Sequence, residues 1–448
     1  MTGVRVTLPA AGRPKEELIA AMRRLASRDA DWRSGRTWSL VYYAGDELTE
    51  FAKQAYMMFF SENALNPMAF PSLKRFEAEV VAMTAGLLGG DAGVVGNMTS
   101  GGSESLLMAV KTARDWARAH RPEVTTPEMV LPASAHPALL KAAHYFGVKA
   151  VRTEVGPDFR ADVEATRRAI TDNTVLMVGS APSYPHGVID PIKEMAALAA
   201  ERNILFHVDS CLGGFLLPFA RRLGYPVPDF DFSVPGVTSI SADVHKYGFS
   251  AKGASVILYR NADIRKYQYF TTADWSGGLY GSPTMTGTRP GGAIAAAWAV
   301  MNYLGEQGYL RLAETTLRTA RALMDGVNSV PGLYVLGQPD MSVFAFASDT
   351  IDVYVLADLM DAKGWHLDRQ QLPPCLHLMV TPAHARVVDA FLADLREAAA
   401  KAASGQVGET PGMAAMYGAI ARMPERGFVN DFLVGLLDDW TTVPPDEP

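Results

Sequence analysis

The sequence contains very little cysteine. Only Cys211 and Cys375 occur in 448 residues, and no C-x-x-C pair is present. This excludes a disulfide scaffold and a structural zinc knuckle, and a reducing compartment is the simplest expectation. His144, His377 and His384 have no metal-ligand spacing with acidic or thiol partners, so we expect no metal site.

The sequence also lacks long apolar runs and an excess of positive charge. No window offers about 18 uncharged apolar residues, and the N-terminus has no apolar core of a signal peptide, so a cytoplasmic protein is expected. Lys and Arg number 41 against 48 Asp and Glu, for a net charge of -7. Nucleic acid is therefore not an expected partner, and an anionic substrate must be held by a few local cations.

What is present indicates an α/β protein with a mostly parallel central sheet. Residues 105–120 carry apolar side chains at helical spacing, whereas 174–179, 204–209 and 254–259 are continuous apolar runs. Such runs are typical of strands buried on both faces of one sheet. From about residue 300 the order αββαβα predicts a smaller C-terminal α+β domain. We expect an N-terminal segment (1–60), a large domain (61–300), a small domain (301–440) and a mobile tail (441–448).

A glycine-rich stretch precedes the first of these helices. Within "GNMTSGGSES" (96–105), Gly101, Gly102 and Ser103 form a plausible phosphate cradle, because glycine admits close approach and helix-start N–H groups favour an anion. The alternative is a helix start that binds no ligand. The stretch has neither the P-loop lysine nor the G-x-G-x-x-G spacing, which disfavours nucleoside-triphosphate and nicotinamide enzymes.

Asp209 and Lys246 are the next candidates along the chain. Asp209 ends a buried strand, where a carboxylate faces a ligand crevice and needs a cationic partner such as a protonated pyridine nitrogen. Its alternative role is a helix cap or a structural carboxylate. Lys246 is able to form a Schiff base with an aldehyde if its pKa is lowered by the neighbouring cations His245 and Lys252. Its alternative is a surface lysine.

Two further histidines are candidates for contact with a cofactor ring. His136 is expected at a helix start, where an imidazole can either stack on a ring or cap its own helix. His207 lies two residues before Asp209 on the same strand, so its side chain shares a face with that carboxylate. A buried structural histidine is the alternative for His207.

These residues, in this order, resemble the pyridoxal-phosphate group II decarboxylase family and, within it, the branch of sphingosine-1-phosphate lyases. The resemblance spans roughly residues 35 to 420 and includes "TSGGSESLLMAVKTARD", "SAHPALLKAAHYFG" and "HVDSCLGGFLLPF". The blocks "SADVHKYGFSAKG" and "GSPTMTGTRPGG" are the most specific to the lyase branch. The resemblance implies a fold-type-I enzyme that works as a homodimer with shared active sites.

The resemblance also implies roles for individual residues. Lys246 matches the lysine that binds pyridoxal phosphate, Asp209 the partner of its pyridine nitrogen, and His136 the histidine that stacks on its ring. The remaining matches are near the cofactor phosphate (Gly102, Ser103, His245 and, from the other subunit, Ser282) or near the substrate (Lys252 and Tyr42). Asn66 stands where many lyases have a histidine associated with the substrate phosphate.

The implied function is retro-aldol cleavage of a phosphorylated long-chain amino alcohol to a fatty aldehyde and phosphoethanolamine. An amino-acid α-decarboxylase would use the same cofactor and the same lysine, histidine and aspartate, and is the alternative. A third possibility is a dimeric relative that only binds ligands, which the intact Lys246 and Asp209 argue against.

Overall fold

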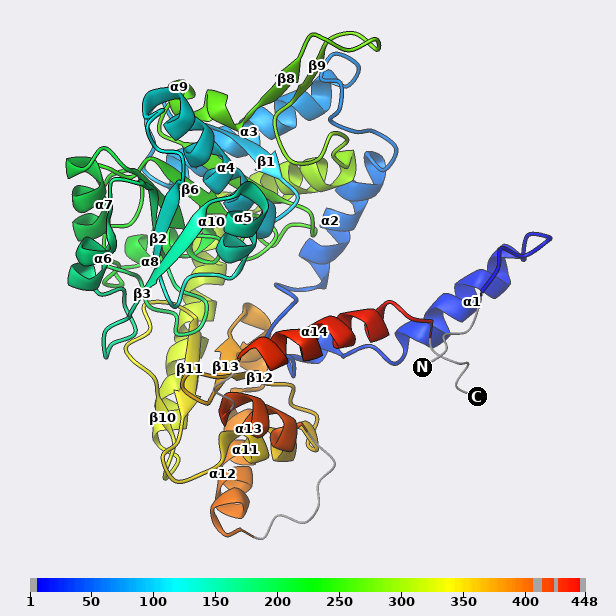
Figure 1. Cartoon of the computed structure of the whole chain (residues 1–448). Coiled ribbons are helices and arrows are strands. Elements are labelled where there is room, and N and C mark those ends of the chain that lie inside the picture. The colour runs from blue at the N-terminus through cyan, green and yellow to red at the C-terminus, as the bar shows by residue number, and fades with distance from the viewer. Residues whose placement is uncertain (1–5, 406–412, 423–425, 444–448) are drawn as a thin grey trace.

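The computed structural model describes residues 6–405, 413–422 and 426–443, and its large domain is built on a seven-stranded sheet (Figure 1). The strand order is β1-β7-β6-β5-β4-β2-β3. Strand β7 runs antiparallel to both of its neighbours, and the other adjacent pairs are parallel. The strands are β1 (Val95–Thr99), β2 (Glu128–Pro132), β3 (Lys149–Thr153), β4 (Thr174–Ser180), β5 (Leu205–Asp209), β6 (Ser239–Ala242) and β7 (Ser255–Tyr259).

Helices cover both faces of this sheet. Successive residues of β4 alternate between two apolar cores: Leu176 and Val178 pack with α4 and α5, whereas Met177 belongs to the larger core on the opposite face. This alternation explains why residues 176–178 are all apolar. The helices of the large domain are α3 (Pro71–Leu87), α4 (Gly102–His120), α5 (Ala138–Phe146), α6 (Val163–Ala169), α7 (Ile192–Glu201), α8 (Leu217–Arg222) and α9 (Ala262–Arg265).

The small domain has its own sheet and its own apolar core. Its four antiparallel strands follow the order β10-β11-β13-β12, with β10 (Tyr334–Val335), β11 (Val343–Ala347), β12 (Asp368–Gln370) and β13 (Cys375–Met379). Helices α11 (Val353–Asp361) and α12 (Val388–Ala403) pack against it. Helix α10 (Gly291–Asn328) belongs to the cores of both domains, with non-helical dihedral angles at Gly305. The predicted boundary at residue 300 therefore falls inside a helix that joins the domains.

Several peripheral elements lie outside the two cores. Helix α2 (Asp46–Met58) packs on α10, but α1 (Lys15–Ala26) buries no side chain. Figure 1 shows α1 and α14 (Arg426–Trp440) extending away from the large domain, and the hairpin of β8 (Phe270–Thr272) and β9 (Tyr280–Ser282) projecting from its far end. Helix α13 (Ala414–Arg422) contacts α11. Within the described residues, no helix has the length and apolar character needed to cross a membrane.

The α/β architecture and its principal elements agree with the sequence predictions. The helix at 105–120 is confirmed as α4, and the three apolar runs are confirmed as β4, β5 and β7 of one buried sheet. The order in the small domain is also confirmed, although β12 was not predicted. Most of the predicted tail (441–448) lies outside the described residues.

Candidate active site

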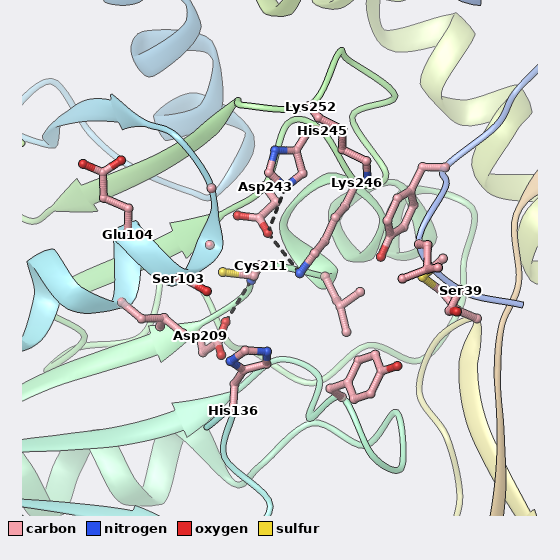
Figure 2. Close-up of a pocket in the computed structure, with 18 of the residues that line it drawn as sticks. Ser39, Ser103, Glu104, His136, Asp209, Cys211, Asp243, His245, Lys246 and Lys252 are labelled. Carbon is pink, nitrogen blue, oxygen red and sulfur yellow. Dashed lines mark hydrogen bonds and ion pairs between the residues drawn. The ribbon is translucent and has the colours of Figure 1, made fainter. Parts of the chain in front are cut away.

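A cavity of about 560 Å³ opens where β4, β5 and β6 reach their carboxyl ends (Figure 2). Ser180 and Asp209 end two of these parallel strands, and Asp243 directly follows the third. Polar side chains at this edge of a parallel sheet face a shared crevice. The other lining residues come from the start of α4, from the segment at 39–42, from the loop at 245–252 and from the small domain, which contributes Asp368 and Met379.

The predicted phosphate cradle forms one wall of this cavity. Gly101, Gly102 and Ser103 line it at the start of α4, where backbone N–H groups are not used by the helix. A Cβ atom on Gly102 would lie 2.7 Å from Oδ2 of Asp243 and 2.9 Å from Sγ of Cys211, so a larger residue does not fit there. The packing of Asp243 and Cys211 against this position therefore requires glycine at residue 102.

Asp209 lies at the bottom of the cavity with its carboxylate largely buried. Its Oδ1 accepts a hydrogen bond from the backbone N–H of Cys211 (3.1 Å), and no basic side chain among the described residues forms an ion pair with it. A buried carboxylate of this kind is stabilised by a cation that enters the cavity. The arrangement favours the ligand-facing role of Asp209 over the purely structural alternative.

His136 combines the two roles that were considered for it. Its Nδ1 accepts a hydrogen bond from the backbone N–H of Ala138 (3.2 Å), so it caps α5, and its ring also lines the cavity near Asp209 (Figure 2). Burial lowers the pKa of His136, which keeps the imidazole uncharged near neutral pH. A neutral ring held by its own helix start is suited to stack on a flat ligand.

The environment of Lys246 corrects one sequence prediction. Its Nζ lies 3.0 Å from Oδ2 of Asp243, a carboxylate that is 1% exposed. Burial alone would lower the pKa of Lys246, but Asp243 together with Cys211 and Asp209 outweighs this effect and raises the pKa above its ordinary value. The prediction that His245 and Lys252 leave Lys246 with a lowered pKa is therefore wrong for this state of the protein, because the sequence argument did not include Asp243.

Lys252 has the lowered pKa that was expected for Lys246. Burial lowers the pKa of Lys252 to about 8, and the charge of Lys246 adds to the effect. Its Nζ lies 4.9 Å from the ring centre of Tyr42, which also lines the cavity and packs edge-on against Tyr247. The side chain of Lys252 is exposed, yet it lines the cavity next to Tyr42. Contact of these two residues with a substrate stays a prediction.

His245 lines the cavity as a neutral ring with a defined tautomer. Its Nδ1 accepts a hydrogen bond from the backbone N–H of Ala254 (3.1 Å), which leaves the proton on Nε2, 3.7 Å from Oδ2 of Asp243. Burial lowers the pKa of His245 to about 4. An Nε2–H group beside the start of α4 is available to donate to an anion there.

Three residues singled out from the sequence do not line this cavity. His207 is fully buried between Ser239 and Ser241, at 2.9 Å and 3.2 Å, which favours the structural alternative. The hydroxyl of Ser282 donates to the carbonyl of Thr284 within its own loop. The side chain of Asn66 accepts a hydrogen bond from the N–H of Met68. Contact of Ser282 with a cofactor in another subunit stays a prediction.

The structure also brings in residues that the sequence did not single out. Asp243 precedes Lys246 by three positions in "SADVHK", a spacing that would have indicated an ion pair. Tyr184 and Asp368 are hydrogen-bonded to each other (3.1 Å) across the two domains, and no sequence pattern links them. The buried carboxylate of Glu104 accepts from the backbone N–H groups of Ser100 and Met285 and so fixes the loop in front of α4.

These residues fit pyridoxal phosphate. A phosphate has the glycine wall and the Nε2–H of His245, a protonated pyridine nitrogen has the buried carboxylate of Asp209, and the aldehyde has Lys246. His136 would lie against the ring. Among the described residues no cluster of histidine, cysteine and acidic side chains is able to hold a metal ion.

Comparisons with known proteins lead to the same conclusion. Residues 32–348 match the pyridoxal-dependent decarboxylase conserved domain. The chain is 49% identical to the sphingosine-1-phosphate lyase of Arabidopsis thaliana over 94% of this chain and 79% of that protein. It is 44% identical to sphingosine-1-phosphate lyase 1 of Rattus norvegicus over 98% of this chain and 78% of that protein.

Two solved structures show how far the fold is shared. A sphingosine-1-phosphate lyase of Burkholderia pseudomallei is 40% identical, with a TM-score of 0.91 over 99% of this chain and 98% of that one. A glutamate decarboxylase of Lactobacillus brevis is 20% identical and shares the fold. Its TM-score is 0.79, and the match covers 90% of this chain and 96% of that one. The protein is a pyridoxal-phosphate-dependent lyase. It belongs to the pyridoxal-dependent decarboxylase family and, within that family, to the sphingosine-1-phosphate lyases.

Proposed function

We propose that this protein cleaves a phosphorylated long-chain amino alcohol of the sphingosine-1-phosphate type to a fatty aldehyde and phosphoethanolamine. The observation that carries the proposal is the pair of lysines in one cavity. Lys246 is placed to bind the cofactor, and Lys252 adds a second amine with a pKa of about 8. The similarity of nearly the whole chain to sphingosine-1-phosphate lyases supports the same substrate class.

Lys246 and Asp209 have separate tasks in this reaction. When bound, pyridoxal phosphate supplies an electron sink for the carbon–carbon bond that breaks. Lys246 holds the cofactor before and after turnover, and Asp209 would keep the pyridine nitrogen protonated. The proton of the substrate 3-hydroxyl is removed, the bond between carbons 2 and 3 breaks, carbon 3 becomes the aldehyde carbon, and carbon 2 gains a proton.

Lys252 has two possible tasks in this scheme. As a neutral amine it accepts the 3-hydroxyl proton, and as an ammonium it holds the substrate phosphate. A pKa of about 8 allows both forms near neutral pH. Tyr42 stacks under its Nζ at 4.9 Å and fixes the position of that nitrogen.

We propose that the working form is a homodimer with shared active sites. Helix α1 buries no side chain, and α14 exposes apolar side chains, among them Phe428, Leu437 and Trp440. The β8–β9 hairpin exposes Trp275 and Leu279. Exposed apolar surface of this extent is typical of a region that another subunit covers. A second subunit would also give Ser282, which lies outside its own cavity, a site to contact.

The dimer gives a direct prediction for the mass in solution. Light scattering after size-exclusion chromatography should give twice the chain mass of 48.4 kDa. Replacing Trp275 and Leu279 together with serine removes exposed apolar area from the β8–β9 hairpin, so the variant should dissociate at a higher protein concentration than the parent. A monomer at micromolar concentration, with full activity, would contradict shared active sites.

We also propose a reducing, cytoplasmic location. Cys211 and Cys375 are both free and buried, and neither has a disulfide partner. A fusion to a redox-sensitive reporter would test this location.

Product analysis tests the substrate class. The protein is incubated with sphingosine 1-phosphate and, separately, with a panel of amino acids. We expect fatty aldehyde from the former and no carbon dioxide from the latter. Carbon dioxide release from an amino acid, without cleavage of the amino alcohol, would favour the α-decarboxylase that shares this family's cofactor and fold.

A further inference from the structure

Asp243 is a buried carboxylate that lines the cavity but has no assigned part in the proposed reaction. It directly follows β6, is 1% exposed and contacts the start of α4 at Gly102. Its Oδ2 lies 3.0 Å from Nζ of Lys246 and 3.7 Å from Nε2 of His245 (Figure 2). Both neighbours line the cavity and are residues that would hold the cofactor.

The local backbone explains why these two side chains meet. The N–H of Lys246 donates to the carbonyl of Asp243 (3.2 Å), which closes a turn over residues 243–246. The N–H of Asp243 donates to the carbonyl of Cys211 (3.3 Å), which ties the start of the turn to the end of β5. The turn directs both side chains toward the cavity, so the backbone conformation itself brings the two charged groups together.

The ion pair opposes the chemistry that Lys246 must perform. An amine attacks an aldehyde only after it has lost its proton, and a carboxylate at 3.0 Å stabilises the protonated form. Other titratable groups also face Lys246: Asp209, Cys211, His136, Tyr184, His245, Tyr247 and Lys252. Among the described residues, Asp243 alone forms an ion pair with Lys246.

We propose that Asp243 is a positioning residue that holds Lys246 protonated and directed at the start of α4 in the cofactor-free protein, and so sets the pH range in which Lys246 captures pyridoxal phosphate. The proposal concerns binding of the cofactor, so it does not depend on which substrate the enzyme cleaves. The raised pKa of Lys246 is consistent with it.

The capture of the aldehyde by Lys246 requires one deprotonation and one protonation. Capture joins Nζ of Lys246 to the aldehyde carbon and releases the aldehyde oxygen as water. Nζ first loses one proton to solvent, which the charge of Asp243 opposes, and one proton is taken up from solvent when the oxygen leaves as water. No outside oxidant, reductant or co-reactant is needed.

The test measures cofactor capture by the full-length, cofactor-free protein. Pyridoxal phosphate is mixed with the protein across a range of pH, and the rate at which the visible absorbance band appears is followed. Asp243→Asn removes the charge, so burial of Lys246 then dominates. We expect the midpoint of the rate–pH profile to fall by about 1–3 pH units, the shift typical of one close opposite charge.

The matched control is Asp368→Asn. Asp368 lines the same cavity, but its carboxylate is bonded to Ser39 and Tyr184 and not to Lys246. Its removal should leave the midpoint where it is in the parent protein. Asp243→Glu, which restores the charge, should bring the midpoint back toward the parent value.

A structural role for Asp243 would give a different result. It would lower the amplitude of capture or the stability of the protein and leave the midpoint unchanged. Should Asp243→Asn fail to fold, Asp243→Ser removes the same charge with a smaller side chain and must give the same downward shift. A midpoint equal to that of the parent in either folded variant overturns the proposal.

Discussion

Lys246→Ala is expected to abolish the covalent attachment of pyridoxal phosphate and to lower turnover by about 10³-fold or more, the scale seen when a covalent catalytic group is removed. The reason is that Lys246 is the lysine of the cavity that lies beside both the glycine wall and Asp209. Borohydride reduction of the loaded protein, followed by peptide mass analysis, locates the attachment. The parent should carry the adduct on Lys246 and the variant should carry none.

The control for this experiment is an exposed lysine of the same domain. Lys193 on α7 is exposed and does not line the cavity. Lys193→Ala should keep the adduct, the absorbance band and the turnover of the parent. A reduced adduct on another lysine of the Lys246→Ala variant would show that the anchor has been assigned to the wrong residue.

Lys252→Ala is expected to retain the cofactor and to lose about 10²–10⁴-fold in turnover, the range for removal of a proton-transferring side chain. The lysine is half-way between charged and neutral near pH 8, because burial and the charge of Lys246 lower its pKa to about 8. Unchanged turnover together with an unchanged KM would show that Lys252 takes no part in binding or catalysis.

The pH dependence separates the two tasks of Lys252. If its neutral amine accepts the 3-hydroxyl proton, kcat rises as the pH increases through about 8. If its ammonium holds the substrate phosphate, KM rises over the same interval while kcat is unaffected. Lys252→Arg keeps a positive charge but provides no base near neutral pH, so it preserves KM in the second case and loses turnover in the first.

Much of the fold was predictable because local patterns determine it. Strands β4 and β5 are buried at every position and mostly apolar, and the ligand-facing role of Asp209 follows from the rule that ligands bind at the carboxyl ends of parallel strands. The phosphate cradle was proposed from the glycine-rich stretch itself, and Gly101, Gly102 and Ser103 do line the cavity. In each case a short, continuous stretch of sequence was enough for the prediction.

Other parts of the site depend on packing between distant segments. The sequence placed cations near Lys246 but not the carboxylate that outweighs them, so the direction of its pKa shift was predicted incorrectly. Tyr184 and Asp368 meet across two domains, 184 positions apart, and no periodicity links them. His207 was expected at the cofactor because it shares a strand face with Asp209. In the structure both of its ring nitrogens are hydrogen-bonded to serine hydroxyls of the adjacent strand β6.

The most direct test of carbon–carbon bond cleavage is the mass of the product formed from sphingosine 1-phosphate in deuterium oxide. The proposed reaction predicts fatty aldehyde and phosphoethanolamine in equal amounts, with a single non-exchanging deuterium on the carbon next to nitrogen, because that carbon gains its proton after the bond breaks. Intact substrate, or aldehyde without labelled phosphoethanolamine, would contradict the proposed function.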